Sequence, residues 1–558
     1  MRERVQSLLA AAAACAVAAV ACGPAQPGAS LAGSLAAPAP ARIGSPTAVP
    51  LSAAIRQAVP LGPAGAATQV YLSLGLKGRD PERLATLLAA GQTVSPSEYA
   101  RQFGPDPALV QAAVAVLEAR GLHATWSPSS GLIAVDGPAP AAAALLGVAI
   151  QNYRLANGTS FYASLDQPRI PAQLATIVDS VTGLDNYTTA FSHAVRPGGL
   201  TPTDTKTFYN LAPLRSQGLD GTGQTIVLPE IDNLPNLSDL DKFATKFGLP
   251  PFEPLLTIKR DPSWGTPEAP AGETVMDLEI IHEIAPNAKL VIYLAGPQLA
   301  LADRAFDQMV TDHLGSIISD SLGQCEAGIP SGHRNLIASI EDRAVAQGMS
   351  HFVASGDAGA FGCGDGTTLS VDFPSALPNI TSVGGTTAFQ AVNGGYFKEM
   401  AWNGPIEGAG TGGGVSRYYA RPSYQNGVAL ASAQGMRQVP DVAGDADPSS
   451  GFSFIFEGRA GQAGGTSAAA PLWAATTALV NQDLKKKGLR EAGFANPALY
   501  WMAQNSSKLP APPFHDVTSG NNLATDAGPG WDFATGLGSM DAAALDQAWI
   551  LYIKGGGA

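Results

Sequence analysis

The sequence predicts an α/β protein with two folded units, a smaller α+β unit followed by a larger one on a mostly parallel sheet. Three observations support this prediction. The chain has 558 residues, which is more than one ordinary domain. Strand-like and helical stretches follow one another in mixed order over residues 56–190. From about residue 200, short apolar strands such as TIVLPEI and KLVIYLA alternate with helical stretches, which is typical of a parallel sheet covered on both faces.

The first 22 residues are predicted to be a signal peptide. Arg2 and Arg4 precede an apolar, Ala-rich run that extends from Leu8 to Ala21, and this order is typical of export signals. The run is short for a transmembrane helix. A small residue directly before Cys22 also indicates lipoprotein processing, with the lipid on that cysteine, and plain secretion is the alternative. We therefore expect a secreted or extracytoplasmic protein, anchored to the membrane if Cys22 carries a lipid.

Two segments without a periodic pattern flank the smaller unit. Residues 23–55 are rich in Ala, Pro and Gly and predict a flexible linker. Residues 191–205 are polar, contain Gly and Pro, and predict an exposed linker of the kind that proteases cut. The second unit is then expected over residues 206–558.

The net charge of −13 and the lack of a basic stripe argue against a nucleic-acid partner.

A glycine-rich turn carries the candidate nucleophile. The run Gly464-Gly465-Thr466-Ser467 follows a strand-like stretch and opens an apolar helix. A serine at a helix N-terminus lies near backbone N–H groups, as a nucleophile requires. The alternative is that Thr466 or Ser467 only caps the helix.

Two acidic residues on one predicted helix are candidates for the base. Glu273 and Asp277 are four residues apart and share a helical face that continues into Ile280. Carboxylates on a buried face are costly unless they are paired or functional, and close carboxylates share a proton. A solvated acidic edge is the alternative, because Glu279 and Glu283 make the other faces acidic as well. None of the seven histidines lies in a motif typical of a His base.

A third acidic residue follows an apolar strand. Asp357 lies in Ser355-Gly356-Asp357-Ala358-Gly359, directly after the strand, where functional loops occur in α/β sheets. A plain turn residue is the alternative for this position.

Together these segments resemble the sedolisin–kumamolisin family of serine-carboxyl peptidases. The resemblance implies a subtilisin-like catalytic domain preceded by an activation pro-domain. It makes Ser467 the nucleophile, Glu273 the general base and Asp277 the residue that orients the base. It also implies that Asp357 stabilises the oxyanion and that Glu230, at the end of the first strand of the catalytic domain, extends the hydrogen-bond chain.

The implied function is that of an acid peptidase made as an inactive precursor. Its partners would be protein or peptide substrates and its own pro-domain, and we expect a monomer. An aspartate donates to an oxyanion only when protonated, and a Glu base has a lower pKa than His, so both roles suit low pH. Leu322 stands where the family often has Trp, which leaves the subsite preference open. The choice between endopeptidase and tripeptidyl-peptidase action is open as well. A subtilisin-type enzyme with a His base and a non-enzymatic binding protein are the alternatives.

The C-terminal segment predicts a calcium site. Its carboxylates and Gly-rich turns offer oxygen ligands alone, which suits Ca²⁺. By resemblance the ligands are Asp516, the carbonyl groups of Val517, Gly528 and Gly530, and Asp532. Two ordinary turn aspartates are the alternative.

Four cysteines are present, of which two lie in the predicted leader. The other two, Cys325 and Cys363, can form one disulfide in an exported protein or remain buried thiols. No CxxC pair indicates zinc. Both residues follow strand ends on the presumed active-site side, so we predict that they are bonded.

Overall fold

The computed structural model describes residues 51–555 apart from 157, 189–198, 235–236, 405–407, 432 and 434. The predicted signal peptide, the lipid site at Cys22 and most of the first linker lie outside the described residues. Among the described helices, none combines the length and the apolar character that a membrane span requires.

The N-terminal domain is the expected α+β unit. Its larger sheet is antiparallel in the order β3-β4-β2-β7, and a smaller antiparallel sheet has the order β1-β5-β6. The strands are β1 (Val59–Pro63), β2 (Gln69–Leu76), β3 (His123–Thr125), β4 (Leu132–Pro138), β5 (Gln151–Arg154), β6 (Ser160–Ala163) and β7 (Val178–Thr182). The helices are α1 (Leu51–Gln57), α2 (Pro81–Ala89), α3 (Pro96–Gln102), α4 (Pro107–Glu118) and α5 (Ala139–Leu146).

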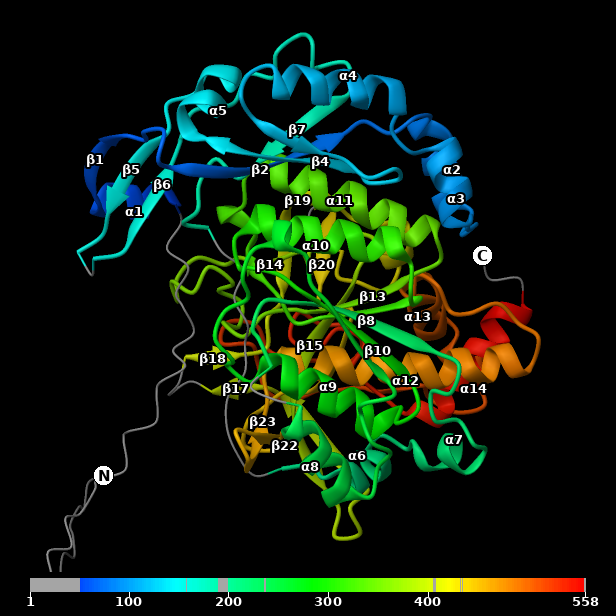
Figure 1. Ribbon diagram of the computed structural model, residues 1–558. Helices are drawn as coiled ribbons and strands as arrows, with labels where there is room; N and C mark the ends of the chain where they lie inside the picture. The colour runs from blue at the N-terminus through cyan, green and yellow to red at the C-terminus, as the bar shows by residue number, and fades with distance from the viewer. Residues whose placement is uncertain are drawn as a thin grey trace, which may run out of the picture. The chain divides into compact units, whose positions relative to one another are not determined.

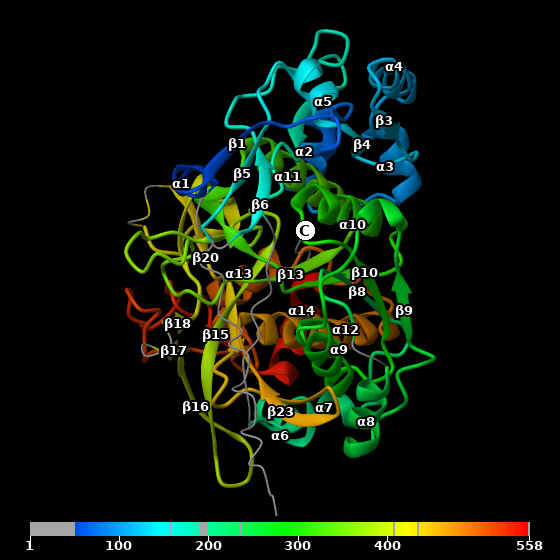
Figure 2. The ribbon, with the colours of Figure 1, turned by 60° about the vertical axis from the view of Figure 1, so that its left-hand side comes forward.

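Strand β2 is buried on both faces, because helices of two domains cover it. Leu72 and Leu74 pack with Val110 and Leu117 of α4 in the core of the N-terminal domain. Ser73, which points the other way, donates to the carbonyl of Ala300 in the second domain at 3.0 Å. The larger sheet therefore lies between its own helices and α10 (Leu299–Asp312) and α11 (Ser331–Ala346), as Figures 1 and 2 show.

The C-terminal domain is built on a mixed but mostly parallel sheet. Among the described residues it has eight strands, in the order β16-β15-β13-β11-β8-β10-β9 with β21 paired to β15. Every pair is parallel except β15 with β16. These strands are β8 (Thr225–Glu230), β9 (Leu256–Lys259), β10 (Lys289–Leu294), β11 (Ile317–Asp320), β13 (Ser350–Ala354), β15 (Thr381–Gln390), β16 (Tyr396–Ala401) and β21 (Val442–Asp445).

Helices on both faces explain why the strands of this sheet are continuous apolar runs. Ile226 and Leu228 of β8 belong to the cluster with α9 and α12, whereas Val227 between them belongs to the cluster with α10 and α11. The remaining helices are α6 (Pro202–Phe208), α7 (Ala212–Ser216), α8 (Ser238–Phe247), α9 (Glu273–Ile284), α12 (Thr466–Lys486), α13 (Asn496–Gln504) and α14 (Ala542–Lys554). Short strands complete the domain: β12 (Gln324–Cys325), β14 (Asp372–Phe373), β17 (Asn403–Gly404), β18 (Ala409–Gly410), β19 (Gly414–Ala420), β20 (Met436–Val439), β22 (Phe452–Phe456), β23 (Arg459–Ala463), β24 (Phe514–His515) and β25 (Ser539–Met540).

Both predicted linkers end too late. Helix α1 already begins at Leu51, inside the segment 23–55. Residues 199–205 belong to the second domain, because the Leu200 carbonyl accepts from the Ser453 N–H at 2.8 Å and α6 begins at Pro202. Thr201 and Asp204 form a reciprocal capping box at the start of α6. The sequence Thr-Pro-Thr-Asp at 201–204 contains this capping pattern, but the polar composition of the segment predicted a linker instead.

Candidate active site

Ser467 is the second residue of α12 and is completely buried. Gly465 before the helix has a φ of 99°, which side chains disfavour. No side chain caps this helix end, and the Ser467 hydroxyl donates to the carbonyl of Ser321 at 3.4 Å. The capping alternative is therefore wrong for Ser467, and no histidine is hydrogen-bonded to it in the described part of the chain.

Helix α9 places two carboxylates beside this serine. Every residue of α9 is buried, so the alternative of a solvated acidic edge is wrong. The helix is anchored by Asp232, whose carboxylate accepts from the N–H groups of Gly272 and Thr274, both at 3.1 Å. Such a cap satisfies donors that a helix start leaves unpaired. Glu273 in the first turn and Asp277 one turn later therefore have defined positions.

Ser321, directly after β11, joins α9 to α12. Its hydroxyl contacts Asp277 Oδ2 at 2.6 Å and the Ser467 carbonyl at 3.2 Å. Neither oxygen of Glu273 has a partner with good hydrogen-bond geometry, but the Ser467 side chain lies close enough to lower the pKa of Glu273. Glu230, the last residue of β8, accepts from the Thr274 hydroxyl at 3.0 Å. The structure thus brings the predicted base, its partner and the nucleophile together.

The electrostatics of this cluster favour the protonated forms of its carboxyl groups. Burial raises the pKa of Glu230, Glu273 and Asp277 well above their usual values. The next cause for Glu230 and Glu273 is the neighbouring Asp277, and Asp232 and Asp320 raise the pKa of Asp277 further. Because close carboxyl groups titrate together, they share protons as a group.

Asp357 approaches the nucleophile from the loop after β13. Its Oδ1 accepts from the N–H of Thr466 at 2.8 Å and from the Thr466 hydroxyl at 2.7 Å. The residue next to the nucleophile therefore orients this carboxyl. Gly356 has a φ of 105°, and a Cβ there would lie 2.2 Å from a carboxylate oxygen of buried Asp372. Glycine is thus required for the turn that presents Asp357.

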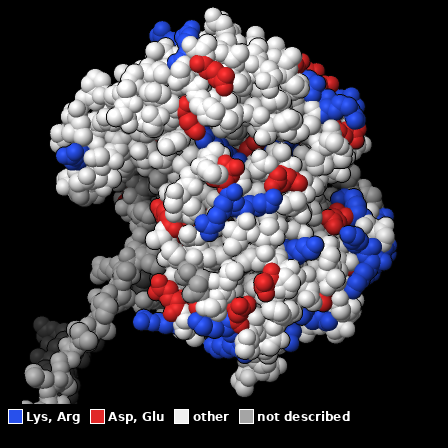
Figure 3. All heavy atoms as spheres, viewed as in Figure 1, with Lys and Arg blue, Asp and Glu red and all other residues white. Residues whose placement is uncertain are grey.

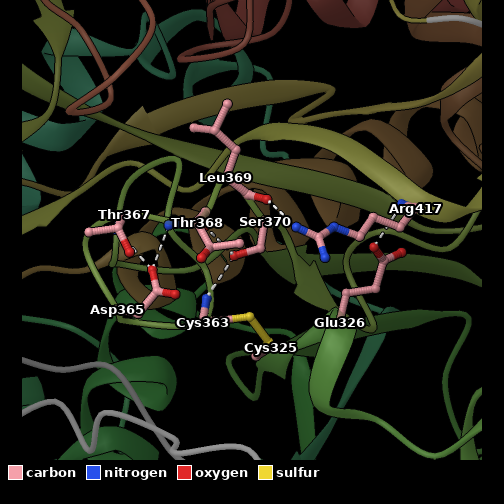
Figure 4. Close-up of a disulfide and its surroundings, with 9 residues drawn as sticks. All are labelled: Cys325, Glu326, Cys363, Asp365, Thr367, Thr368, Leu369, Ser370 and Arg417. Atoms are coloured by element: carbon pink, nitrogen blue, oxygen red, sulfur yellow. Dashed lines mark hydrogen bonds between the residues drawn. A yellow bond between two sulfur atoms is a disulfide. The ribbon is translucent and has the colours of Figure 1, made fainter.

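The predicted disulfide is confirmed. Cys325 and Cys363 are bonded, with their Cα atoms 4.5 Å apart, and Figure 4 shows the bond beside the loop that ends at Ser370. The Cys363 N–H donates to the Ser370 hydroxyl at 2.9 Å. The bond ties the segment after Leu322 to the loop that follows Asp357. Leu322 itself packs against Ile231.

The predicted calcium ligands lie around one turn. The Gly528 N–H donates to Asp532 Oδ2 at 2.9 Å, and the Gly530 N–H donates to Asp516 Oδ2 at 3.0 Å. A carboxylate oxygen that accepts one amide hydrogen keeps a second lone pair for a cation. Burial raises the pKa of Asp532, and its hydrogen bonds act in the opposite sense. Val517, which follows Asp516 in the sequence, is buried. Among the described residues no group of three or more His, Cys, Asp or Glu side chains could hold a metal ion, so a hard cation at this turn would need backbone oxygens besides the two carboxylates.

Sequence reasoning missed two residues of the site. Asp232 caps α9, and Ser321 joins Asp277 to Ser467. A signal existed for the first, since Asp232 stands two residues after Glu230 at the end of an apolar strand.

Comparisons with known proteins identify both domains. Residues 56–187 match the family model "Pro-kumamolisin, activation domain", and residues 266–536 match "Subtilase family". The chain is 33% identical to kumamolisin of Bacillus sp. (strain MN-32), over 76% of this chain and 79% of the relative. It is 31% identical to sedolisin of Pseudomonas sp. (strain 101), over 91% of both chains. A solved structure of Pseudomonas sedolisin, a serine-carboxyl proteinase bound to two molecules of pseudo-iodotyrostatin, aligns with a TM-score of 0.56 and 30% identity, over 65% of this chain and all of the other.

Proposed function

Because the chain belongs to the sedolisin–kumamolisin family of serine-type peptidases, we propose that it cleaves peptide bonds in acid through Ser467. The observation that carries this proposal is the buried cluster in which Ser321 joins Asp277 of α9 to the residue Ser467 on α12. The N-terminal domain is its activation pro-domain, and the second domain is its subtilisin-like catalytic domain.

In the proposed mechanism, Glu273 takes the proton of the Ser467 hydroxyl as the oxygen attacks the scissile carbonyl. Asp277 would orient Glu273 for this transfer, and Glu230, which accepts from the Thr274 hydroxyl, is electrostatically coupled to both carboxyl groups. The developing oxyanion is stabilised by a protonated carboxyl of Asp357. The proton on Glu273 then passes to the leaving amine, and water repeats the sequence to release the acyl group from the serine.

Ser467→Ala tests the proposal. The full-length precursor of this variant should remain uncut at about pH 4, where the wild type should mature. A matched control is Ser507→Ala, which removes an exposed serine hydroxyl from the same domain and should mature normally. Maturation of a pure Ser467→Ala precursor, with no other protease present, would show that self-processing does not use this serine.

The pro-domain is proposed to inhibit the enzyme and to assist its folding. It is held by charged groups on α10: the Arg304 guanidinium donates to Asp136 at 2.6 Å, and Asp307 accepts from the Ser130 hydroxyl at 2.7 Å. Buried charges of this kind are tolerated only in well-paired contacts. Figure 3 shows that on the outer surface of this view acidic and basic side chains are interspersed. Because Arg304 and Asp307 of α10 are paired with groups of the pro-domain, we expect α10 to need the pro-domain until the catalytic domain has folded.

Calcium and export are further parts of the proposal. Asp516 and Asp532, with the carbonyls of Val517, Gly528 and Gly530, would hold one structural Ca²⁺ ion. The ion would supply the positive charge that two neighbouring carboxylates lack, and it has no part in bond cleavage. The Arg-containing, apolar N-terminus supports export, with lipid attachment if Cys22 is processed. Mass spectrometry of the mature N-terminus from the native host would distinguish lipidation from plain secretion.

A further inference from the structure

A second buried charged cluster lies behind the proposed active site. His351 of β13 is 1% exposed at its side chain and lies between two carboxylates. Its Nδ1 is 2.8 Å from Glu341 Oε1 on α11, and its Nε2 is 3.4 Å from Asp320 Oδ2 at the end of β11. The second distance is that of an ion pair without hydrogen-bond geometry. None of these three groups takes part in the mechanism described above.

The cluster holds a cation. Burial lowers the pKa of His351, but Glu341 and Asp320 outweigh burial and raise it to about 9. The imidazole is therefore protonated throughout the acid range. An imidazolium without access to water is costly, and it persists only where carboxylates pair with it. The ring of Phe306 on α10 covers one side of it.

Asp320 connects this cation to the catalytic carboxylates. Its Oδ1 accepts from the N–H of Leu322 at 2.8 Å, so its carboxylate shapes the turn that contains Ser321. The Ser321 hydroxyl contacts Asp277. The negative charge of Asp320 also raises the pKa of Asp277. One side chain thus contributes both to the geometry of the turn and to the electrostatic potential at Asp277.

We propose that His351 is a positioning residue of the active site, which neutralises and orients Asp320 and thereby controls the protonation of the Glu273–Asp277 pair. This inference rests on the proposed roles of Glu273 and Asp277. The described titratable groups facing His351 are Glu341 and Asp320. The carboxylates that raise the pKa of Asp277 are Asp232 and Asp320, and Asp277 in turn raises the pKa of Glu230 and Glu273. The imidazolium of His351 lies against Asp320 and so would offset the charge of that one carboxylate.

Two substitutions should move the pH profile in opposite directions. His351→Gln leaves the charge of Asp320 without its cation, so proton loss from the catalytic pair becomes harder. The acid limb of kcat/KM should then move to higher pH by about half a unit to one unit. Asp320→Asn keeps an acceptor for Leu322 but removes the charge, so the limb should move to lower pH by a similar amount. The double variant should lie between the two.

The measurement is kcat/KM of the mature enzyme on one peptide substrate from about pH 2 to pH 6. His333→Gln is the control, because His333 is paired with another aspartate, Asp303 at 3.2 Å, outside the cluster. Its acid limb should not move. If His351 and Asp320 had a purely structural role, both substitutions would lower the stability of the enzyme, and the acid limb of kcat/KM would not move in opposite directions. If His351→Gln does not fold, Asp320→Asn decides alone.

An unmoved acid limb in Asp320→Asn, or shifts of the same sign in both variants, would overturn the inference. Glu273→Gln in the same assay separates this result from the proposed function. Full activity of Glu273→Gln would refute the mechanism itself. An inactive Glu273→Gln combined with an unmoved limb in Asp320→Asn would refute only the role of His351.

Discussion

Removing the Ser321 hydroxyl tests the connection between α9 and the nucleophile. This hydroxyl donates to Asp277 Oδ2 at 2.6 Å, and the other oxygen, Oδ1, is buried without a partner. A hydrogen bond to a charged group contributes about 1.5–3 kcal/mol. With about 1.4 kcal/mol for each factor of ten, Ser321→Ala should lower kcat/KM by roughly 10- to 100-fold.

The pH profile gives the same substitution a second readout. The Ser321 hydrogen bond lowers the pKa of Asp277, so its loss raises that pKa. Because the catalytic pair must lose a proton to accept one from Ser467, the acid limb of kcat/KM should move to higher pH. KM should change less than kcat, because the lost contact is within the protein.

The matched control is Ser319→Ala, two residues earlier and within β11. The Ser319 hydroxyl is also buried but has no hydrogen-bond partner, so its removal should leave kcat/KM unchanged. Wild-type kcat/KM and an unchanged acid limb in Ser321→Ala, with the fold intact by circular dichroism, would refute the role assigned to this hydroxyl.

Three further predictions concern the catalytic carboxyl groups, acid stability and calcium. In steady-state assays, Glu273→Gln should remove nearly all activity, and Asp357→Asn should cost about 10²–10³ in kcat with a weaker acid dependence, because an amide donates at any pH; a wild-type rate in either would exclude that role. Burial raises the pKa of Glu283 to about 8 and of Glu399 to about 7. The folded state therefore binds the protons of Glu283 and Glu399 more tightly than the unfolded state does. Their contribution to the melting temperature should be greatest below about pH 4 to 5 and should be lost as the pH rises towards 8. Melting curves that show no decline across this range would contradict the prediction. Chelation of calcium, or Asp532→Ala, should lower the melting temperature more than the initial rate in the cold; an unchanged melting temperature in excess chelator, with no metal by elemental analysis, would show that the turn binds no ion.

The local features of this protein could be predicted from its sequence. Continuous apolar runs in β8 and β10 identified strands that are covered on both faces, and the glycines before Ser467 identified a turn that opens a helix. Glu273 and Asp277 shared a helical face because their spacing alone decides it. These inferences succeeded because backbone conformation and hydrophobic period depend on neighbouring residues.

Tertiary structure decided which of these residues meet. Ser321 contacts Asp277 across 44 positions and Ser467 across 146 positions, and Asp320 meets His351 because β11 and β13 are adjacent in the sheet. No local pattern distinguished Ser321 from Ser319, although one hydroxyl joins the site and the other has no partner. The difference arises because Ser319 lies within β11, whereas Ser321 lies in the turn after it, where side chains no longer follow the alternation of the strand. Strand order and the packing of α9 and α12 against one face then determine which direction leads to the nucleophile.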